Sequence, residues 1–300
     1  MITDKINALK KEKNAIILAH YYVDDQVQKI ADYIGDSYYL SKVAKDTDAS
    51  QIIFAGVEFM GESAKLLNPS KRVFMPDITA DCPMAHMVTD EEIDGMRKKY
   101  DDLAVVCYIN STAHIKAKSD VCVTSANAVK IVKNLPNKNI FFIPDKNLGD
   151  FVRRQVPEKN VITNNGFCPR HARITVEDVK RAKELHPNAK FAAHPECTRE
   201  VLDYADYIGS TSGIIKYVAD TQCDEFIIGT VDGVFVKLNE VAPGKKFYPV
   251  VSSQICVNMK KVTLEKILYV MENECNEVFL DDSIAKDALK PLDRMLELAK

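Results

Sequence analysis

Short apolar runs alternate with longer stretches of mixed polarity along the whole chain. The runs have the length of strands, and the stretches between them place apolar residues at helical spacing, so the pattern predicts alternating strands and helices. One predicted helix starts at Asp25 and runs to Ile34, where Gly35 would end it. Another opens with a capping box over 89–92. The predicted strands are 15–19, a weaker run near 36–38, 51–56, 72–76, 103–109, 120–124, 139–143, 160–162, 189–193, 206–208, 225–229 and 246–251.

This pattern repeats three times. Cys82, Cys168 and Cys256 stand at nearly equal intervals and mark the period. A repeat that keeps its apolar frame while its polar residues change indicates a pseudo-threefold protein with one asymmetric site at its centre. The other polar residues in register, each just after an apolar run, are His20 and Tyr22 with Tyr108 and Asn110 and with His194 and Glu196, and Ser37 with Ser125 and Thr211.

Alternating strands and helices in units this short predict parallel sheets joined by right-handed crossovers. We therefore expect the α/β fold class, with three related domains that each have three layers, α/β/α, around a short parallel sheet. The expected domains are 1–85, 86–172 and 173–262. The last stretch, 263–300, is expected to form two helices and a short extended run that pack back on the first domain and close the ring.

The polar residues in register all follow predicted strands. Parallel sheets bind ligands beyond the carboxyl ends of their strands, so three such edges facing a common axis would bring these side chains into one cavity. Three thiolates from three sheets suit an iron–sulfur cluster better than zinc, because structural zinc takes four ligands, usually in close pairs. A cubane held by Cys82, Cys168 and Cys256 would leave one iron free to act as a Lewis acid in the elimination of water. The alternative is three buried structural thiols, and the common period of the three argues against it.

The remaining residues in register offer proton transfer and anion binding. His20, Tyr22, Tyr108, His194 and Glu196 have the graded pKa values that general acid–base catalysis requires. A second set of side chains carries hydroxyls at predicted helix starts, where free backbone N–H groups bind carboxylate or phosphate. Helix capping without a ligand is the alternative for this set, and the two roles can coexist. Its members are Ser37, Ser125, Ser210 and Thr211.

Composition narrows the class of ligand. The net charge of −3 gives no general attraction to nucleic acid or to anionic membranes, so we expect a small-molecule ligand. The chain opens directly into an amphipathic stretch, with no apolar signal core or membrane span, which favours the cytoplasm. The eight cysteines are dispersed and lack paired short spacings, so they are not expected to form disulfides.

Taken together, these motifs resemble quinolinate synthase, the iron–sulfur enzyme family of de novo NAD (pyridine nucleotide) biosynthesis. The resemblance covers essentially the whole chain. Two departures stand out: Tyr21 occupies a position where many members carry Asn, and Arg170 lies close to a cluster cysteine. The side chain of Tyr21 should face away from the site, because neighbours on an extended segment point in opposite directions. The motifs that carry the resemblance are 17–22, 35–37, 82–85, 108–112, 124–128, 144–148, 168–169, 194–197, 209–211 and 256–260.

The resemblance implies a reaction and roles for the residues. The family condenses iminoaspartate (iminosuccinate) with dihydroxyacetone phosphate, and phosphate and water leave as the ring closes to quinolinate. By its pattern Cys82, Cys168 and Cys256 would hold a 4Fe-4S cluster, whose open iron would hold the substrate. Tyr22 and Glu196 would move protons. The resemblance places His194 and Tyr108 near the reacting carbons, and His20, Ser37, Asn110, Ser125 and Thr211 around the dicarboxylate or the phosphate. It also implies transient transfer of iminoaspartate from an enzyme that produces it.

Two alternatives stay open. The diphthamide-synthesis iron–sulfur family also builds three similar domains with one cysteine each, but it performs radical chemistry on S-adenosylmethionine and a protein histidine. His194 and Glu196, as a proton-transfer pair, favour quinolinate synthase over that family. A non-catalytic iron–sulfur sensor would need an output surface or a basic helix that reads DNA, and neither is evident in the sequence.

Overall fold

Each third of the chain repeats one order of elements, in which a helix precedes each of four strands. The computed structural model describes all residues, 1–300. The first unit comprises α1 (Ile2–Glu12), β1 (Ala15–His20), α2 (Asp25–Ile30), β2 (Tyr33–Gly35), α3 (Ser37–Asp46), β3 (Gln51–Ala55), α4 (Glu58–Leu67) and β4 (Arg72–Phe74). The second comprises α5 (Asp90–Lys99), β5 (Leu103–Tyr108), α6 (Ala113–Ala117), β6 (Val121–Val123), α7 (Ala128–Asn134), β7 (Asn139–Ile143), α8 (Lys146–Gln155) and β8 (Asn160–Thr163). The third comprises α9 (Val176–Leu185), β9 (Lys190–Ala193), α10 (Arg199–Leu202), β10 (Tyr207–Ile208), α11 (Thr211–Asp220), β11 (Glu225–Gly229), α12 (Val234–Val241) and β12 (Lys246–Pro249).

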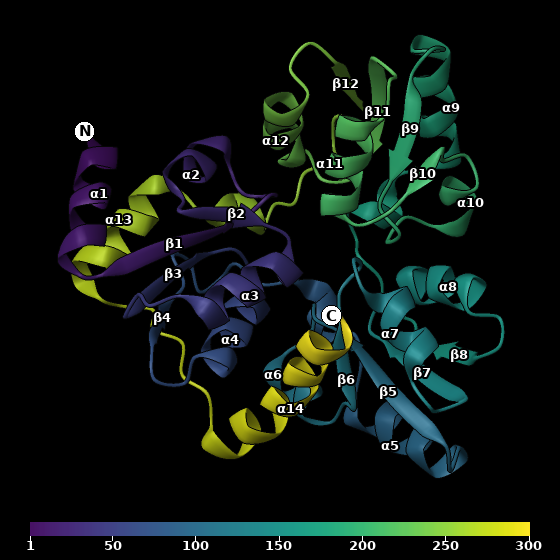
Figure 1. Cartoon of the computed structure of the whole chain (residues 1–300), viewed down its shortest axis with the longest axis horizontal. Coiled ribbons are helices and arrows are strands. Elements are labelled where there is room, and N and C mark those ends of the chain that lie inside the picture. Colours follow the sequence, from purple (N-terminus) through teal and green to yellow (C-terminus); the bar gives the residue numbers. More distant parts are fainter.

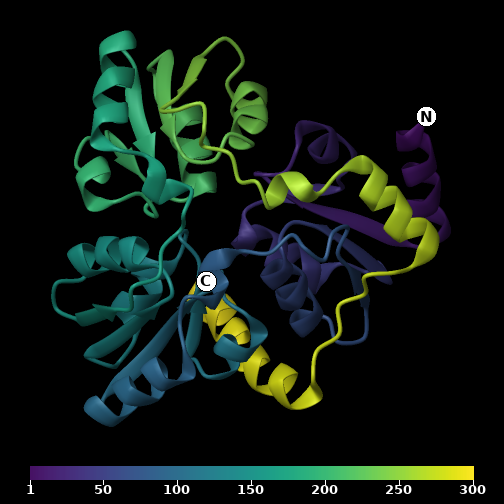
Figure 2. The same cartoon turned by 180° about the vertical axis from the view of Figure 1, so that it is seen from behind.

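The strands of each unit form one parallel sheet with the same topology. The three sheets have the orders β2-β1-β3-β4, β6-β5-β7-β8 and β10-β9-β11-β12. In each sheet the central pair is the first strand beside the third, in continuous register. Figure 1 shows the three units as lobes around a common centre, and Figure 2 shows the same arrangement from behind. The predicted α/β class and its three α/β/α units are confirmed.

The local sequence explains where the elements start. The capping box predicted at 89–92 opens α5: the Thr89 hydroxyl accepts the Glu92 N–H at 3.3 Å, and the Glu92 carboxylate accepts the Thr89 N–H at 2.9 Å.

Strand β5 is buried along its whole length, as expected of a strand covered by helices on both faces. One connected core of 72 buried residues runs through all three units, so the units pack into one body.

Two local predictions were wrong. Helix α2 ends at Ile30, and the second strand is Tyr33–Gly35 where the sequence indicated helix and then a weak strand near 36–38. The reason is Asp32, whose N–H donates to the Ile17 carbonyl at 2.9 Å while its carboxylate accepts the Ile17 N–H at 2.8 Å. These bonds draw the segment against β1 and override its helical spacing. The same pair of hydrogen bonds recurs in the other units, between Asp120 and Val105 and between Asp206 and Phe191.

The C-terminal stretch forms α13 (Leu264–Asn273) and α14 (Asp282–Leu298). Helix α13 packs on α1 and β3 of the first unit. Helix α14 packs mainly against α6 and β6 of the second unit and also against α4 of the first, so it is not confined to the first unit (Figure 2). Its buried stripe of Ala288, Leu292 and Met295 fills the seam between the two units. No helix of the protein is both long and apolar enough to cross a membrane.

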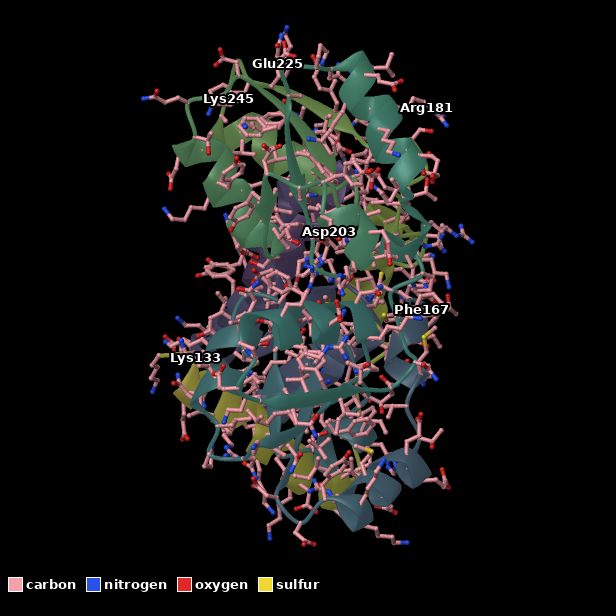
Figure 3. The ribbon with its side chains drawn as sticks, turned by 90° about the vertical axis from the view of Figure 1, so that its right-hand side faces the viewer. Lys133, Phe167, Arg181, Asp203, Glu225 and Lys245 are labelled. Atoms are coloured by element: carbon pink, nitrogen blue, oxygen red, sulfur yellow. The ribbon has the colours of Figure 1, made fainter.

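Polar contacts also join the second and third units. Figure 3 shows Asp203 close to the junction between them, and Arg154 of α8 lies 3.3 Å from its carboxylate, measured from Nη1 to Oδ1. At the junction of the third and first units, the Gly233 carbonyl accepts the Gln28 side-chain N–H at 3.0 Å. A Cβ at Gly233 would lie 2.4 Å from the carbonyl oxygen of Tyr21 and 2.7 Å from Cα of Tyr22. The first and third units therefore meet backbone to backbone at this glycine.

Replacing Gly233 with alanine is expected to lower the free energy of unfolding by about 1–3 kcal/mol, because the added methyl group forces the two backbones apart. Thermal unfolding followed by circular dichroism measures the change. The matched control is Gly95→Ala in α5, where nothing lies within 4 Å of the new methyl group. That control should stabilise the protein by about 0.5–1 kcal/mol. Equal unfolding midpoints for Gly233→Ala and the native chain would contradict the close approach.

Candidate active site

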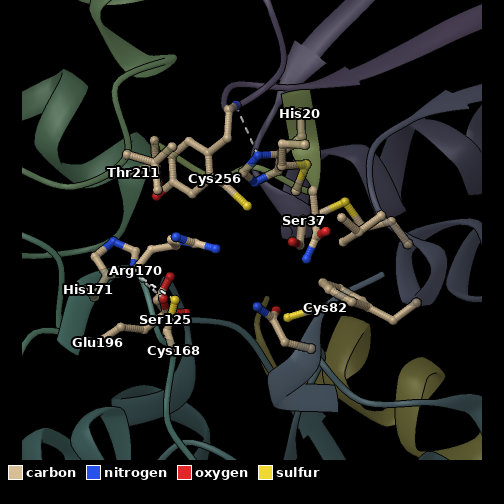
Figure 4. A pocket seen from close by; sticks show the side chains of 18 of the residues that line it. His20, Ser37, Cys82, Ser125, Cys168, Arg170, His171, Glu196, Thr211 and Cys256 are labelled. Carbon is tan, nitrogen blue, oxygen red and sulfur yellow. Dashed lines mark hydrogen bonds and ion pairs between the residues drawn. The ribbon is translucent and has the colours of Figure 1, made fainter. Parts of the chain in front are cut away.

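The carboxyl ends of the three sheets face one central cavity of about 90 Å³ (Figure 4). Twelve of the thirteen residues singled out in the sequence line it. Ser210 does not; its hydroxyl accepts the Gly213 N–H at 3.1 Å and caps α11. The residues that line the cavity are His20, Tyr22, Ser37, Cys82, Tyr108, Asn110, Ser125, Cys168, His194, Glu196, Thr211 and Cys256. Three separate strand ends of each unit thus contribute to a single site.

Each of the three cysteines stands just before a short 3-10 helix. These helices are η1 (Pro83–His86), η2 (His171–Arg173) and η3 (Met259–Lys261). Backbone N–H groups of these turns lower the pKa of each thiol and so favour the thiolate, which is the form that binds metals. Burial nevertheless raises the pKa of all three thiols, to about 12 for Cys82.

The donor set fits an iron–sulfur cluster better than a single ion. The three cysteines together are not a group that could hold one metal ion. They are still electrostatic neighbours: besides burial, Cys256 raises the pKa of Cys82, and Cys82 raises that of Cys168. Three thiols spread around a cavity match a cubane, in which each cysteine binds a different iron.

One group of side chains does meet the spacing for a single metal ion. It consists of Cys168, His171 and Glu196, whose ligand atoms all lie within 4.8 Å of one another. His171 follows Cys168 by one turn, and its Nδ1 lies 3.2 Å from the cysteine sulfur. The site therefore combines thiol, imidazole and carboxylate donors on one side of the cavity (Figure 4).

His20 and His194 occupy equivalent strand ends and are held in the same way. Nδ1 of His20 accepts the backbone N–H of Tyr22 at 3.2 Å, and Nδ1 of His194 accepts that of Glu196 at 3.3 Å. Each neutral ring therefore carries its proton on Nε2, which His194 donates to the Ser125 hydroxyl at 3.1 Å. Burial lowers the pKa of both imidazoles to about 3, so both are neutral hydrogen-bond donors at pH 7.

Glu196 is the buried carboxylate of the site. The Tyr108 hydroxyl donates to its Oε1 at 2.6 Å, and Nδ1 of His171 lies 2.7 Å from its Oε2. Burial by itself raises the pKa of Glu196, but the nearby His171 and His194, with the hydrogen bonds from His171 and Tyr108, lower it below its ordinary value. The carboxylate is therefore ionised at pH 7 and can accept a proton.

Tyr22 and Tyr108 are the complementary proton donors. The Tyr22 hydroxyl lies 2.7 Å from Oγ1 of Thr211 and 2.7 Å from Oγ1 of Thr230. Burial raises the pKa of both phenols, and the charge of Glu196 raises it further. Two phenols that keep their protons and one carboxylate that loses its proton are the division of acid and base that proton-transfer catalysis uses.

Residues at the start of α8 hold the backbone of two site residues in place. Asp145 is fully buried; its Oδ1 accepts the N–H of Asn147 at 2.8 Å, and its Oδ2 accepts the N–H of Cys168 at 3.2 Å. The side chain of Asn147 donates to the carbonyl oxygen of Glu196 at 3.0 Å. One motif, 144–148, therefore fixes the backbone of a cysteine in the second unit and of the carboxylate in the third.

Sequence reasoning missed two residues of this site. His171 bonds Glu196 and Thr230, and the Thr230 hydroxyl bonds Tyr22. The signal for Thr230 is its place directly after β11, a third strand, whereas the polar residues in register follow first, second and fourth strands. Arg170, noted in the sequence as a departure, also lines the cavity.

Comparison with known proteins agrees with this geometry. The family described as Quinolinate synthetase A protein matches residues 4–297. A quinolinate synthase of Fusobacterium nucleatum is 56% identical over 296 residues, covering 99% of each chain. One from Caldicellulosiruptor saccharolyticus is 50% identical over 298 residues, and one from Clostridioides difficile is 47% identical over 299 residues, each covering 98% of the relative and at least 99% of this chain. The chain belongs to the quinolinate synthetase A family of enzymes.

Proposed function

We propose that this enzyme condenses iminoaspartate (iminosuccinate) with dihydroxyacetone phosphate to quinolinate, with release of phosphate and water. The observation that carries the proposal is the joint lining of one cavity by three cysteines, a buried carboxylate and two protonated tyrosines from three sheets. Relatives named quinolinate synthase along the whole chain support the product. The reaction needs proton transfers and repeated elimination, which these groups can supply.

We assign proton transfer to Tyr22 and Glu196, and we place His194 and Tyr108 beside the reacting carbons. Glu196 is an ionised acceptor, and Tyr22 keeps its proton until a developing anion takes it. The neutral Nε2–H of His194 is suited to donate a hydrogen bond to a substrate oxygen without adding charge.

The anionic ends of the substrates need several donors, and helix starts supply them. Ser37 and Thr211 are the first residues of α3 and α11, where hydroxyls stand beside free backbone N–H groups. We assign substrate binding to these two residues together with His20, Tyr108, Asn110, Ser125, His194 and Glu196, and Ser210 contributes by capping the helix that carries Thr211.

We propose that Cys82, Cys168 and Cys256 hold a 4Fe-4S cluster. When bound, the cluster supplies an iron without a protein ligand that polarises a substrate hydroxyl or carboxylate for loss of water. The net charge of −3 and the small cavity favour small-molecule substrates over nucleic acid or membrane. We propose that the enzyme works in the cytoplasm. We also propose that iminoaspartate arrives by transient transfer from the enzyme that produces it.

The test is quinolinate formation by protein purified without oxygen and supplied with both substrates, with iron and sulfide counted on the same sample. We expect product from protein that carries about four irons per chain, as a cubane requires. Protein freed of iron, and reactions without dihydroxyacetone phosphate, are the controls and should give no quinolinate. A full cluster without product contradicts the proposal, and cleavage of S-adenosylmethionine by that sample would support the radical alternative instead.

A further inference from the structure

We infer that Thr230 is a positioning residue whose hydroxyl, through His171, fixes Tyr22 and Glu196 relative to each other. The inference rests on the proposed function, in which Tyr22 and Glu196 transfer protons. Thr230 directly follows β11, and its side chain is 0% exposed, so nothing but protein reaches its hydroxyl.

The Thr230 hydroxyl has two side-chain partners, and they come from different units. Its Oγ1 lies 2.7 Å from the hydroxyl of Tyr22 in the first unit and 2.9 Å from Nε2 of His171 in the second. Thr230 itself belongs to the third unit. A single buried hydroxyl therefore joins the three lobes at the level of the site.

His171 carries the connection on to Glu196. Its side chain is 2% exposed, and its Nδ1 lies 2.7 Å from Oε2 of Glu196 and 3.2 Å from the sulfur of Cys168. An ionised carboxylate only accepts, so Nδ1 donates to it. The Tyr22 hydroxyl, the Thr230 hydroxyl, the His171 ring and the Glu196 carboxylate thus form one unbroken chain of hydrogen bonds.

The hydroxyl of Thr230 is not needed to hold its own backbone. The carbonyl of Thr230 accepts a hydrogen bond from the side chain of Gln254 at 2.5 Å, and the same amide binds the carbonyl of Ile228 at 2.8 Å. Gln254 therefore fixes this strand end independently. The partners of the hydroxyl are side chains of the site alone, which is the arrangement expected of a group that orients catalytic residues.

The test compares Thr230→Val, which removes the hydroxyl and keeps the shape, with Thr230→Ser, which keeps the hydroxyl. We expect Thr230→Val to lower kcat about tenfold with KM within about twofold, because misplaced proton-transfer groups slow the reaction more than they weaken binding. Thr230→Ser should restore kcat to within about twofold of the native enzyme. Iron content should stay native in both variants, and both should remain fully folded at the assay temperature, although Thr230→Val unfolds somewhat earlier because it leaves His171 without a buried partner. Loss of iron, or unfolding at the assay temperature, in Thr230→Val would overturn the inference in favour of a purely structural role.

A double variant tests whether Thr230 acts through Tyr22. In a Tyr22→Phe background, Thr230→Val should cost clearly less than its tenfold effect in the native enzyme, because one of the two groups that Thr230 positions is already gone. A full tenfold loss in that background, or a native kcat in the single variant, would overturn the inference.

Crystal structures of the same proteins separate this inference from the proposed function. A native enzyme that makes no quinolinate would refute the function, yet the positions of Tyr22 and His171 would still report on the bridge. We expect the two side chains to superpose in the native and Thr230→Ser structures and to shift in Thr230→Val. Unmoved side chains in Thr230→Val would overturn the inference, whatever the reaction.

Discussion

Replacing Cys168 with alanine is expected to abolish the broad absorbance at about 400 nm that iron–sulfur centres give. The proposed cubane has three cysteine ligands and none to spare, and Cys168 is held in place from two sides, by Asp145 at its backbone N–H and by His171 at its sulfur. Loss of one thiolate leaves an iron of the cubane without its protein ligand. The measurements are the absorbance spectrum, iron and sulfide after anaerobic reconstitution, and quinolinate formation, which should fall to background.

Cys223→Ala is the matched control for this prediction. Cys223 does not line the cavity, and its thiol donates to the Glu225 carbonyl at 3.3 Å, within its own unit. This variant should keep the full spectrum and the native iron content. Unfolding midpoints of both variants show whether either change disturbs the fold. An intact cubane in a well-folded Cys168→Ala protein would remove Cys168 from the ligand set.

The fold and the meeting of the polar residues could be predicted from the sequence because both depend on one rule. Parallel sheets place the residues after their strands at one edge. Cys82, Cys168 and Cys256 are in register with one another, and so are the residues after the first and second strands. This register predicts the residues that line the cavity and does not depend on how the units pack.

The errors arose where contacts distant in sequence outweighed local spacing. Asp32 binds the backbone of Ile17 and turns a segment with helical periodicity into strand β2, so Ser37 begins a helix and does not lie in a strand. Periodicity depends only on the side chains of one segment, whereas the hydrogen bonds of Asp32 depend on the neighbouring strand. Asp120 and Asp206 make the same pair of hydrogen bonds in the other units. The register of these two residues with Asp32 is therefore the signal in the sequence for the second strand.

His171 and Thr230 show a second limit. Neither has a counterpart of the same chemistry in the other units, because the site is asymmetric and each unit contributes different groups. His171 stands in the turn after Cys168, where η1 and η3 carry no histidine at the equivalent place. A repeat therefore locates the positions from which a site is built, but only the packed structure shows which side chains bond across the units.

Changing Tyr22 to phenylalanine is expected to lower kcat by about 10²–10⁴-fold, the range for loss of a proton-transfer group, while the cluster stays intact. The ring of Tyr22 is 9% exposed and packs in the core, and phenylalanine preserves that packing. What disappears is the hydroxyl between Thr211 and Thr230, and with it the proton that burial and Glu196 keep on the phenol. Steady-state kinetics with both substrates, together with iron content, measure the effect.

The neighbouring Tyr21 provides the control. It does not line the cavity, and burial, with the nearby Asp36, raises the pKa of its phenol to about 12, so this group is also protonated at pH 7. Tyr21→Phe removes the same atom one residue away and should leave kcat within about twofold of native, since Tyr21 is not part of the cavity lining. Near-native turnover in Tyr22→Phe would reduce Tyr22 to a packing residue. Equal losses in both variants would show that the segment after β1 needs its hydroxyls for folding, and that Tyr22 has no separate part in proton transfer.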